Sequence, residues 1–423
     1  MVILYIVFCF LTFVVGRLNY KNFFNPICLY TVVWLISVCI HQSGLIVYYE
    51  LNGFTWIVIF FSHLLFVMGA LSARIFEKTV IEKEPFVLED VQKKLIYRFV
   101  ILCLCVSGFS IVLNVRMMIL RYGMNLFENM MVIYQDRLTD SLRTEVIPYI
   151  SSFLFIAMPL LGIYIKKFGF TLLLIVGLIL SCLNSLTSGG RAGTIFALLL
   201  FLSGYMISGG LIINRLKMFF DQKRKLGYLG ISVIALIIMI VAISEQRSAG
   251  IELDYATNRY TSIFGYNVPL YKGLVYLASP IGVLNEYLKN CEFDFGKNTF
   301  VAFYGFLSKL NLCDKVNPYQ DYFATPSLCN VGTWVRELIE DFTIGGAIVF
   351  IAIFGMLSSI VYSRALCSGT IVNKFIWTIF ALVIILSFFD WKFRTSNLWI
   401  ALFFGILISR YIDVKSADGI KND

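Results

Sequence analysis

Long apolar runs separated by short polar links fill most of the chain. An α-helix needs about 20 apolar residues to cross the hydrocarbon core of a bilayer, and many of the runs approach that length. The pattern therefore predicts an all-α polytopic membrane protein with about eleven transmembrane helices. The predicted spans are Val2–Gly16, Pro26–Ile40, Thr55–Leu71, Leu95–Leu120, Pro148–Ile165, Phe168–Leu186, Thr194–Ile213, Leu226–Ile243, Thr343–Tyr362, Phe375–Phe389 and Asn397–Tyr411.

The positive charges predict the orientation of these spans. Five Lys or Arg residues lie in each of the links Arg74–Lys94 and Arg215–Lys225, whereas His41–Phe54 has none. Because Lys and Arg accumulate in cytoplasmic loops, we expect the N-terminus outside and the C-terminal tail, residues 413–423, inside. The same bias explains the net charge of +9. We find no basic patch interleaved with aromatic residues, so no nucleic-acid partner is expected.

Composition and the lengths of the links predict the domain organisation. Hydrophobic residues make up 59% of the chain and charged residues 14%, which excludes an ordinary soluble domain. We expect a membrane domain with helices one to eight at 1–243, a large outer loop at 244–342, and helices nine to eleven at 343–412.

The segment Arg121–Val146 is predicted to be an amphipathic helix on the outer surface. Its polar residues Asp136, Arg137, Asp140 and Arg143 fill other faces than its apolar residues, which recur at helical spacing. One interpretation is an interfacial helix without a partner, and the other is a mobile lid over a site. The apolar positions are Phe127, Met130, Met131, Tyr134, Leu138 and Leu142.

The large outer loop has too many aromatic residues to be a disordered tether. We expect it to fold into short helices on the membrane surface. Its aromatic side chains can form the core of the loop and an interfacial belt, or they can stack on sugar rings. Of its cysteines, Cys291, Cys313 and Cys329, two can pair in an oxidising compartment. The loop has no histidine and no close cysteine spacing, so no metal site is expected.

Three arginines lie at the ends of predicted outer segments. Arg247 and Arg336 lie at the two mouths of the large loop, and Arg191 lies in the glycine-rich turn Ser188–Gly193. That turn ends where a span begins, so the amides of a helix N-terminus face any anion there. Three cations at one aqueous surface predict an anionic, lipid-borne ligand. The alternatives are a snorkelling arginine for Arg191 and a solvated loop charge for Arg247.

A surface helix is predicted at the second mouth of the loop. Glu337, Glu340 and Asp341 crowd about one and a half turns of it, and such crowding raises carboxylate pKa values toward those of a general base. The alternative for Arg336 is an exposed i,i+4 pair with Glu340. The helix follows from the spacing of its apolar residues, Val331, Trp334, Val335, Leu338 and Phe342.

Three short motifs carry a resemblance to a known family. The run Asn184–Gly193, the run Asn330–Thr333, and Glu340-Asp341-Phe342 before an apolar helix resemble the oligosaccharide repeat-unit polymerases of the O-antigen polymerase (Wzy) type. The likeness extends to the architecture of many spans with one large late loop. The chain departs from the pattern at Gly332, where an aromatic residue is usual, and at Thr343, where glycine is usual.

The resemblance implies a GT-C-like fold and a polymerising glycosyltransferase of the bacterial inner membrane with its site facing the periplasm. Its substrates would be undecaprenyl-diphosphate-linked oligosaccharides, as donor and acceptor, and a chain-length regulator is a further expected partner. Arg191, Arg247 and Arg336 would stabilise the departing diphosphate, so neither metal nor cofactor is required. The base would be Glu337, Glu340 or Asp341. Further substrate contacts are expected from Ser188, Gly190, Arg259, Asn330, Thr333 and Trp334.

Two other functions remain open. An O-antigen ligase shares this layout but typically uses a histidine in its large outer loop, and this loop has none. A flippase or other transporter of lipid-linked glycans would place ionisable residues at mid-membrane depth. The predicted charges gather at the ends of spans instead.

Overall fold

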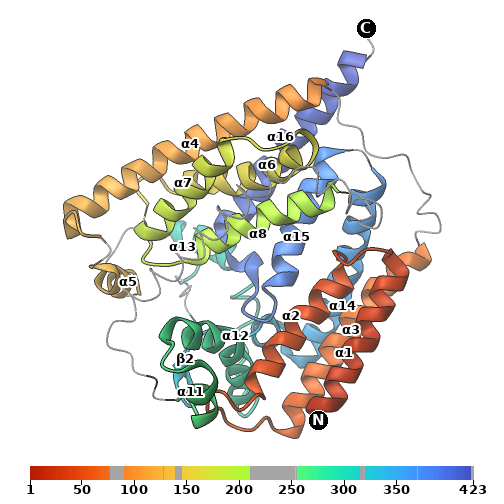
Figure 1. Cartoon of the computed structure of the whole chain (residues 1–423), viewed down its shortest axis with the longest axis vertical. Coiled ribbons are helices and arrows are strands. Elements are labelled where there is room, and N and C mark those ends of the chain that lie inside the picture. The colour runs from red at the N-terminus through yellow and green to blue at the C-terminus, as the bar shows by residue number, and fades with distance from the viewer. Residues whose placement is uncertain are drawn as a thin grey trace. The chain divides into compact units, whose positions relative to one another are not determined.

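The computed structural model of the protein describes residues 1–76, 90–126, 128–138, 145–209, 253, 255–314, 316, 320–368 and 370–420. These residues are mainly helical (Figure 1). Their only sheet is a hairpin of β1 (Phe323–Ala324) and β2 (Leu328–Cys329). The predicted all-α class is confirmed.

Six described helices are long and apolar enough to cross a membrane. Four shorter apolar helices, of 10–17 residues, coincide with further predicted spans. The span Leu226–Ile243 lies outside the described residues, so the total of eleven stays a prediction. The six long helices are Val2–Tyr20, Gly53–Ala73, Asp90–Tyr122, Ile150–Phe168, Trp334–Cys367 and Ser396–Ala417, and the shorter ones are Pro26–His41, Leu173–Thr187, Ala192–Ile207 and Ile371–Ile385.

The chain forms two compact units, and their boundaries differ from the predicted domains. Unit 1 comprises Met1–Val80, Ile251–Ser363 and Val383–Ser396, and unit 2 comprises Ile81–Gly250, Arg364–Leu382 and Asn397–Asp423. The outer loop from residue 251 onward therefore belongs to unit 1 and is not a separate body. The reason is that its longest helix packs on the first helices of the chain.

That helix, α12, ties the loop to the N-terminal helices of unit 1. It packs on α2, where Ser37 Oγ donates to the Leu277 carbonyl at 2.5 Å. Asn285 Oδ1 accepts from the Asn52 amide at 3.0 Å and from Thr55 Oγ1 at 2.9 Å, which fixes the start of α3. The expected short surface helices are thus only part of the loop. Unit 1 contains α1 (Val2–Tyr20), α2 (Pro26–His41), α3 (Gly53–Phe76), α11 (Asn258–Phe264), α12 (Val268–Tyr287), α13 (Val301–Lys309) and most of α14 (Trp334–Cys367).

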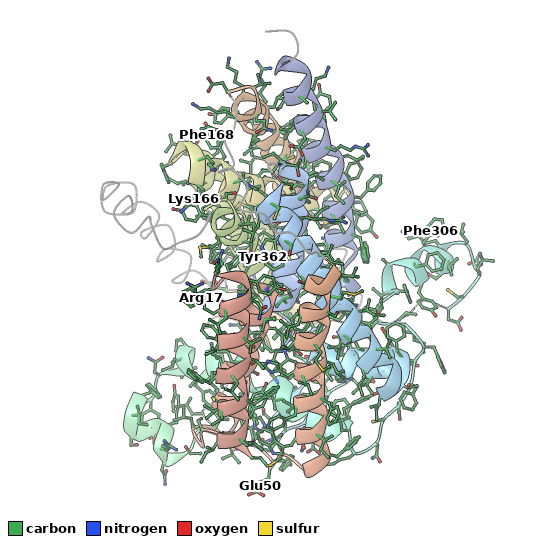
Figure 2. The ribbon with its side chains drawn as sticks, turned by 90° about the vertical axis from the view of Figure 1, so that its right-hand side faces the viewer. Arg17, Glu50, Lys166, Phe168, Phe306 and Tyr362 are labelled. Carbon is green, nitrogen blue, oxygen red and sulfur yellow. The ribbon has the colours of Figure 1, made fainter. Side chains whose placement is uncertain are left out.

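Glycines let α3 and α14 approach closely. A Cβ at Gly69 would lie 1.9 Å from the Ala352 carbonyl oxygen, and one at Gly355 would lie 2.3 Å from the Phe66 carbonyl oxygen. Small residues at such crossings are typical of helix pairs in membranes. In the same unit, Figure 2 places Arg17 and Glu50 toward opposite ends of α1–α3, and the predicted orientation in the membrane stays a prediction.

A break at Thr343 divides α14 in two. Thr343 has φ 63° and ψ 174°, which is not helical. The part before it carries Arg336, Glu337, Glu340 and Asp341, so the apolar part that is able to cross a membrane begins after Thr343. The helix predicted at this mouth is present, but it is buried rather than on the surface, because Trp334, Glu337 and Leu338 are fully enclosed.

Unit 2 is built around α6 and α8. A Cβ at Gly204 of α8 would lie 2.3 Å from the Pro159 carbonyl oxygen of α6, so only glycine fits at this crossing. The helices of unit 2 are α4 (Asp90–Tyr122), α5 (Met130–Leu138), η1 (Ile150–Phe153), α6 (Leu154–Phe168), α7 (Leu173–Thr187), α8 (Ala192–Ile207), most of α15 (Ile371–Ile385) and most of α16 (Ser396–Ile420).

The amphipathic helix predicted over Arg121–Val146 starts later than expected, and its part at 139–144 lies outside the described residues. Arg121 and Tyr122 end α4, because Gly123 follows with φ +83°. The described part of the amphipathic segment is α5, whose Met130 packs on Leu186 of α7. Protein thus covers Met130 and Ile133, whereas Met131 is exposed.

The aromatic residues of the outer loop divide into two groups. Tyr260, Tyr271 and Tyr287 are buried, as a loop core requires, whereas α13 has no buried residue and exposes Phe303 and Phe306, each 59% exposed. Figure 2 shows Phe306 on this helix. The three cysteines of the loop, Cys291, Cys313 and Cys329, form no disulfide in the part of the chain that the structure describes.

Candidate functional site

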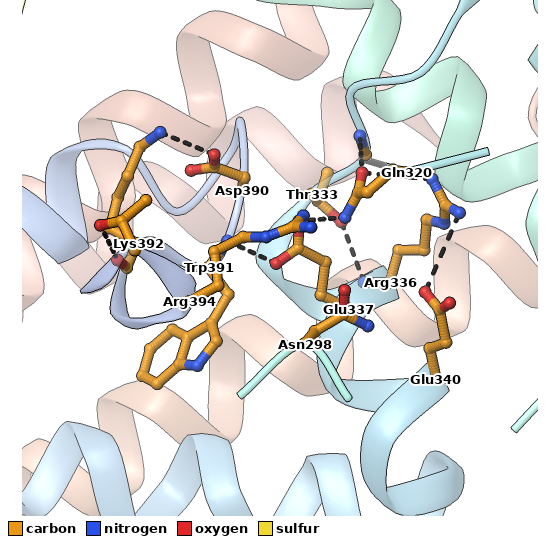
Figure 3. Close-up of polar contacts among 12 residues, drawn as sticks. Asn298, Gln320, Thr333, Arg336, Glu337, Glu340, Asp390, Trp391, Lys392 and Arg394 are labelled. Atoms are coloured by element: carbon orange, nitrogen blue, oxygen red, sulfur yellow. Dashed lines mark hydrogen bonds and ion pairs between the residues drawn. The ribbon is translucent and has the colours of Figure 1, made fainter. Parts of the chain in front are cut away.

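A buried polar cluster of unit 1 lies at the start of α14 (Figure 3). Thr333 precedes the helix, and its Oγ1 accepts the Arg336 amide at 3.3 Å, which caps the first turn. Trp334 is fully buried; its amide donates to the Ser387 carbonyl at 3.0 Å and its indole Nε1 to Tyr30 Oη at 3.3 Å. Both predicted substrate-binding residues therefore anchor the helix. Asn330 is half-buried beside them.

Arg336 is enclosed and only 1% exposed, unlike a solvated surface residue. Its Nη1 donates to Gln320 Oε1 at 3.3 Å, and its Cζ lies 4.7 Å from the ring centre of Phe323. Its Nε is buried and has no hydrogen-bond partner among the described residues. A Cβ at Gly332 would lie 2.5 Å from Arg336 Cδ, so an aromatic residue there would displace the arginine.

Glu337 is fully buried and its carboxylate is saturated with donors. Oε1 accepts from Arg394 Nη1 at 2.9 Å and from Gln320 Nε2, and Oε2 accepts from the Trp391 amide at 3.0 Å. Burial raises the pKa of Glu337, and the ion pair with Arg394 opposes that rise. A carboxylate held by three donors is suited to positioning other groups.

Glu340 accepts fewer side-chain hydrogen bonds than Glu337 and Asp341 do. Its Oε2 lies 3.9 Å from Arg336 Nη2, which is an ion-pair distance but too long for a hydrogen bond. This buried oxygen has no hydrogen-bond partner in the described part of the chain. Burial raises the pKa of Glu340 and Arg336 opposes the rise. The predicted pair with Arg336 thus exists, but it is largely enclosed rather than exposed.

Asp341 holds the loop that leads into α13. Its Oδ1 accepts from the Asn298 amide at 2.8 Å, and its Oδ2 accepts from the Thr299 amide at 2.7 Å. The main chain adds a bond from the Gly296 amide to the Asp341 carbonyl at 3.1 Å. Both carboxylate oxygens are therefore engaged with backbone amides, which is the arrangement of a structural carboxylate.

Two members of the cluster escaped the analysis of the sequence. Gln320 joins Arg336 to Glu337, and Arg394 arrives from the link before α16, in the short helix η3 (Lys392–Arg394). Both are distant in sequence and belong to no local motif. One signal was available: an outer link with two cations, Lys392 and Arg394, runs against the positive-inside bias.

The other predicted turn belongs to unit 2. Arg191 lies at the N-terminus of α8, and Gly189 before it has φ +58°. The Ser188 carbonyl accepts from Arg137 Nη1 of α5 at 3.1 Å. A Cβ at Gly190 would lie 3.5 Å from the same Nη1 atom, so a second arginine adjoins the turn of Arg191.

The remaining arginines are placed as follows. Arg259 Nη1 donates to the Ser43 carbonyl at 2.7 Å and so joins α11 to the α2–α3 link. Arg247 lies outside the described residues. Since Arg191 belongs to unit 2 and Arg336 to unit 1, their predicted convergence stays a prediction.

The cluster at α14 balances its charges. Two guanidinium groups, Arg336 and Arg394, face two carboxylates, Glu337 and Glu340. Of these four side chains, Arg336 Nε and Glu340 Oε2 are left without hydrogen bonds to the described residues. A hydroxyl group both accepts and donates, so it is the ligand group that matches this pair of atoms.

Comparison with known proteins does not assign the site. No protein-family model, no curated protein and no solved structure matches the chain. The likeness to O-antigen polymerases therefore stays a prediction, and function has to be argued from the geometry.

Proposed function

We propose that the chain is a polymerising glycosyltransferase that joins undecaprenyl-diphosphate-linked oligosaccharide repeat units at the periplasmic face of the bacterial inner membrane. The observation that carries the proposal is the enclosed pair of Arg336 and Glu340, which lies directly before the apolar part of α14. An uncharged sugar hydroxyl suits this charge-balanced place. The motif resemblance and the apolar helices support the same assignment.

In the proposed reaction the acceptor hydroxyl binds between Arg336 and Glu340. Its oxygen attacks the anomeric carbon of the donor sugar, and the bond from that carbon to the diphosphate oxygen breaks. The electron pair leaves with the lipid diphosphate, and the hydroxyl proton passes to Glu340 Oε2. Direct displacement inverts the anomeric configuration. Most of the catalysis comes from alignment and charge stabilisation, because diphosphate is already a good leaving group.

The departing diphosphate needs positive charge close to it. Arg191 and Arg247 are proposed for this task, and the α8 N-terminus beside Arg191 favours an anion. Arg336 is paired with Glu340, so its larger contribution is to orient the acceptor and keep Glu340 ionised.

Deletion of the gene, followed by electrophoresis of the surface glycan, tests the assignment. A polymerase predicts loss of the long-chain ladder while single repeats stay attached, whereas a ligase or flippase predicts loss of all attached repeats. Complementation with Arg191→Ala should leave single repeats at an unchanged amount of membrane protein, and Arg410→Ala on α16 is the matched control. A normal ladder from the deletion strain would overturn the proposal.

A further inference from the structure

The side-chain amide of Gln320 occupies the centre of the cluster (Figure 3). Its Oε1 accepts from the Gly332 amide at 3.1 Å and from Arg336 Nη1 at 3.3 Å, while its Nε2 donates to Glu337 Oε1. A single carboxamide thus bridges two donors and one acceptor. The three groups that it contacts come from one stretch of six residues, 332–337.

The groups around the amide are rigid, and this makes them a preformed recognition surface. Arg336 and Glu337 are at most 1% exposed, and Glu337 is fixed from its other side by Arg394 and the Trp391 amide. Gly332 has no room for a side chain, because its Cβ position lies 2.5 Å from Arg336 Cδ. Gln320 itself is only half-buried and comes from the outer loop.

The chemistry of the place favours a neutral ligand group over a phosphate. A phosphate diester has acceptors only, so it would leave Glu337 Oε1 without the donor that Gln320 supplies. Two carboxylates and two guanidinium groups also leave no net positive charge to hold an anion. An amide group, whose carbonyl oxygen accepts and whose N–H donates, reproduces all three contacts.

We propose that an acetamido substituent on the acceptor sugar displaces the Gln320 amide on binding and takes over its three hydrogen bonds. The inference rests on the proposed function and names its substrate class as repeat units with an N-acetylated sugar at the acceptor end. The acetamido carbonyl then accepts from Gly332 and Arg336, and its N–H donates to Glu337. The unpartnered Arg336 Nε and Glu340 Oε2 remain for a hydroxyl of the same sugar.

Binding of simple sugars to the purified full-length protein in nanodiscs tests this inference. The probes are the methyl glycosides of N-acetylglucosamine and N-acetylgalactosamine, with those of glucose and galactose as controls. Gln320→Ala removes the competing amide, so we expect about tenfold lower Kd for the N-acetylated probes and no change for the others. Gln42→Ala, at the end of α2, is the matched control and should behave like the wild type.

The outcomes separate this inference from the proposed function. Equal binding of both probe classes by Gln320→Ala overturns the acetamido site, even where the deletion strain lacks polymer. The protein could prefer N-acetylated probes while deletion of its gene leaves the ladder intact. That result would support the acetamido site and refute the polymerase function. Gln320→Asn, whose shorter side chain does not span the same contacts, should show the same gain if the alanine variant does not fold. No gain from a folded Gln320→Asn would also contradict the inference.

Discussion

Arg394 Nη1 lies 2.9 Å from Glu337 Oε1, and this ion pair joins the link before α16 to the first turn of α14. Glu337 is fully buried, and the Arg394 side chain is 11% exposed. Removing one partner of such a pair leaves an uncompensated charge in a place of low polarity. The pair therefore controls both the stability of the cluster and the protonation of Glu337.

Arg394→Met should destabilise the protein by about 3–5 kcal/mol, because Glu337 then stays buried without a counter-charge. The double variant Arg394→Met with Glu337→Met should recover most of that loss. Thermal unfolding in detergent measures both variants. Equal stability of the single and double variants would contradict the pairing.

The same variant should acquire a characteristic pH dependence. Burial raises the pKa of Glu337, and without Arg394 only the smaller effects of the Trp391 amide and of Arg336 oppose that rise. A group whose pKa is higher in the folded than in the unfolded protein stabilises the folded protein at low pH. That stabilisation is lost as the pH rises through the folded-state pKa. The pKa of Glu337 is already raised to about 7 in the wild type, so Arg394→Met should lose stability relative to the wild type between about pH 7 and about pH 9. A constant difference across this range would show that Glu337 does not titrate there.

Asp341→Ala should loosen the entry to α13 without removing the proposed chemistry. The change leaves the Asn298 and Thr299 amides without their acceptors, at a cost of about 1–3 kcal/mol. Amide hydrogen exchange should rise in residues 296–300, with Asp294→Asn, which alters an exposed pair with Lys297, as the control. Unchanged exchange in that segment would leave the structural role of Asp341 without support.

Thr343→Gly should stabilise the protein by about 1 kcal/mol, because a β-branched residue is strained at φ 63° and glycine is not. Ala347→Gly, in the helical part of α14, should instead cost about 1 kcal/mol. If both glycine variants lower the unfolding temperature, the break at Thr343 is not present.

The exposed face of α13 should lie in the membrane interface. Asp341 holds the segment before this helix next to the point where the apolar part of α14 begins. The rings of Phe303 and Phe306 on the helix are exposed. Aromatic side chains favour the interfacial region of a bilayer. Phe306→Trp should add fluorescence that brominated lipids quench, relative to the wild type. Added fluorescence that resists such lipids would place the helix in water or against protein.

The apolar runs predicted the helices well, because each span must satisfy its backbone hydrogen bonds internally and so depends on local sequence. The start of α14 was predicted for the same reason, since its apolar residues repeat at helical spacing. The division into units was not predicted. It depends on α12 packing against α2, a contact between residues more than 200 positions apart, such as Ser37 and Leu277.

The candidate site was predicted in part. Arg336, Glu337 and Glu340 are neighbours on one helix, so their proximity follows from the sequence. The sequence does not show which carboxylate lacks hydrogen bonds, because the partners of Glu337 and Asp341 come from segments around residues 394 and 298. The roles of Trp334 and Thr333 as helix anchors also depend on tertiary contacts that no local pattern reveals.

The most direct test of the account is the surface-glycan ladder of the deletion strain carrying Glu340→Gln, compared with Glu286→Gln, which alters only a salt bridge of α12 with Lys289 and a neighbouring amide contact. With Glu340 as the base, the rate of polymerisation should fall by about 100-fold or more, leaving single repeats at a normal level of folded protein. The Glu286→Gln strain should keep its ladder. A normal ladder from Glu340→Gln would contradict the proposed site.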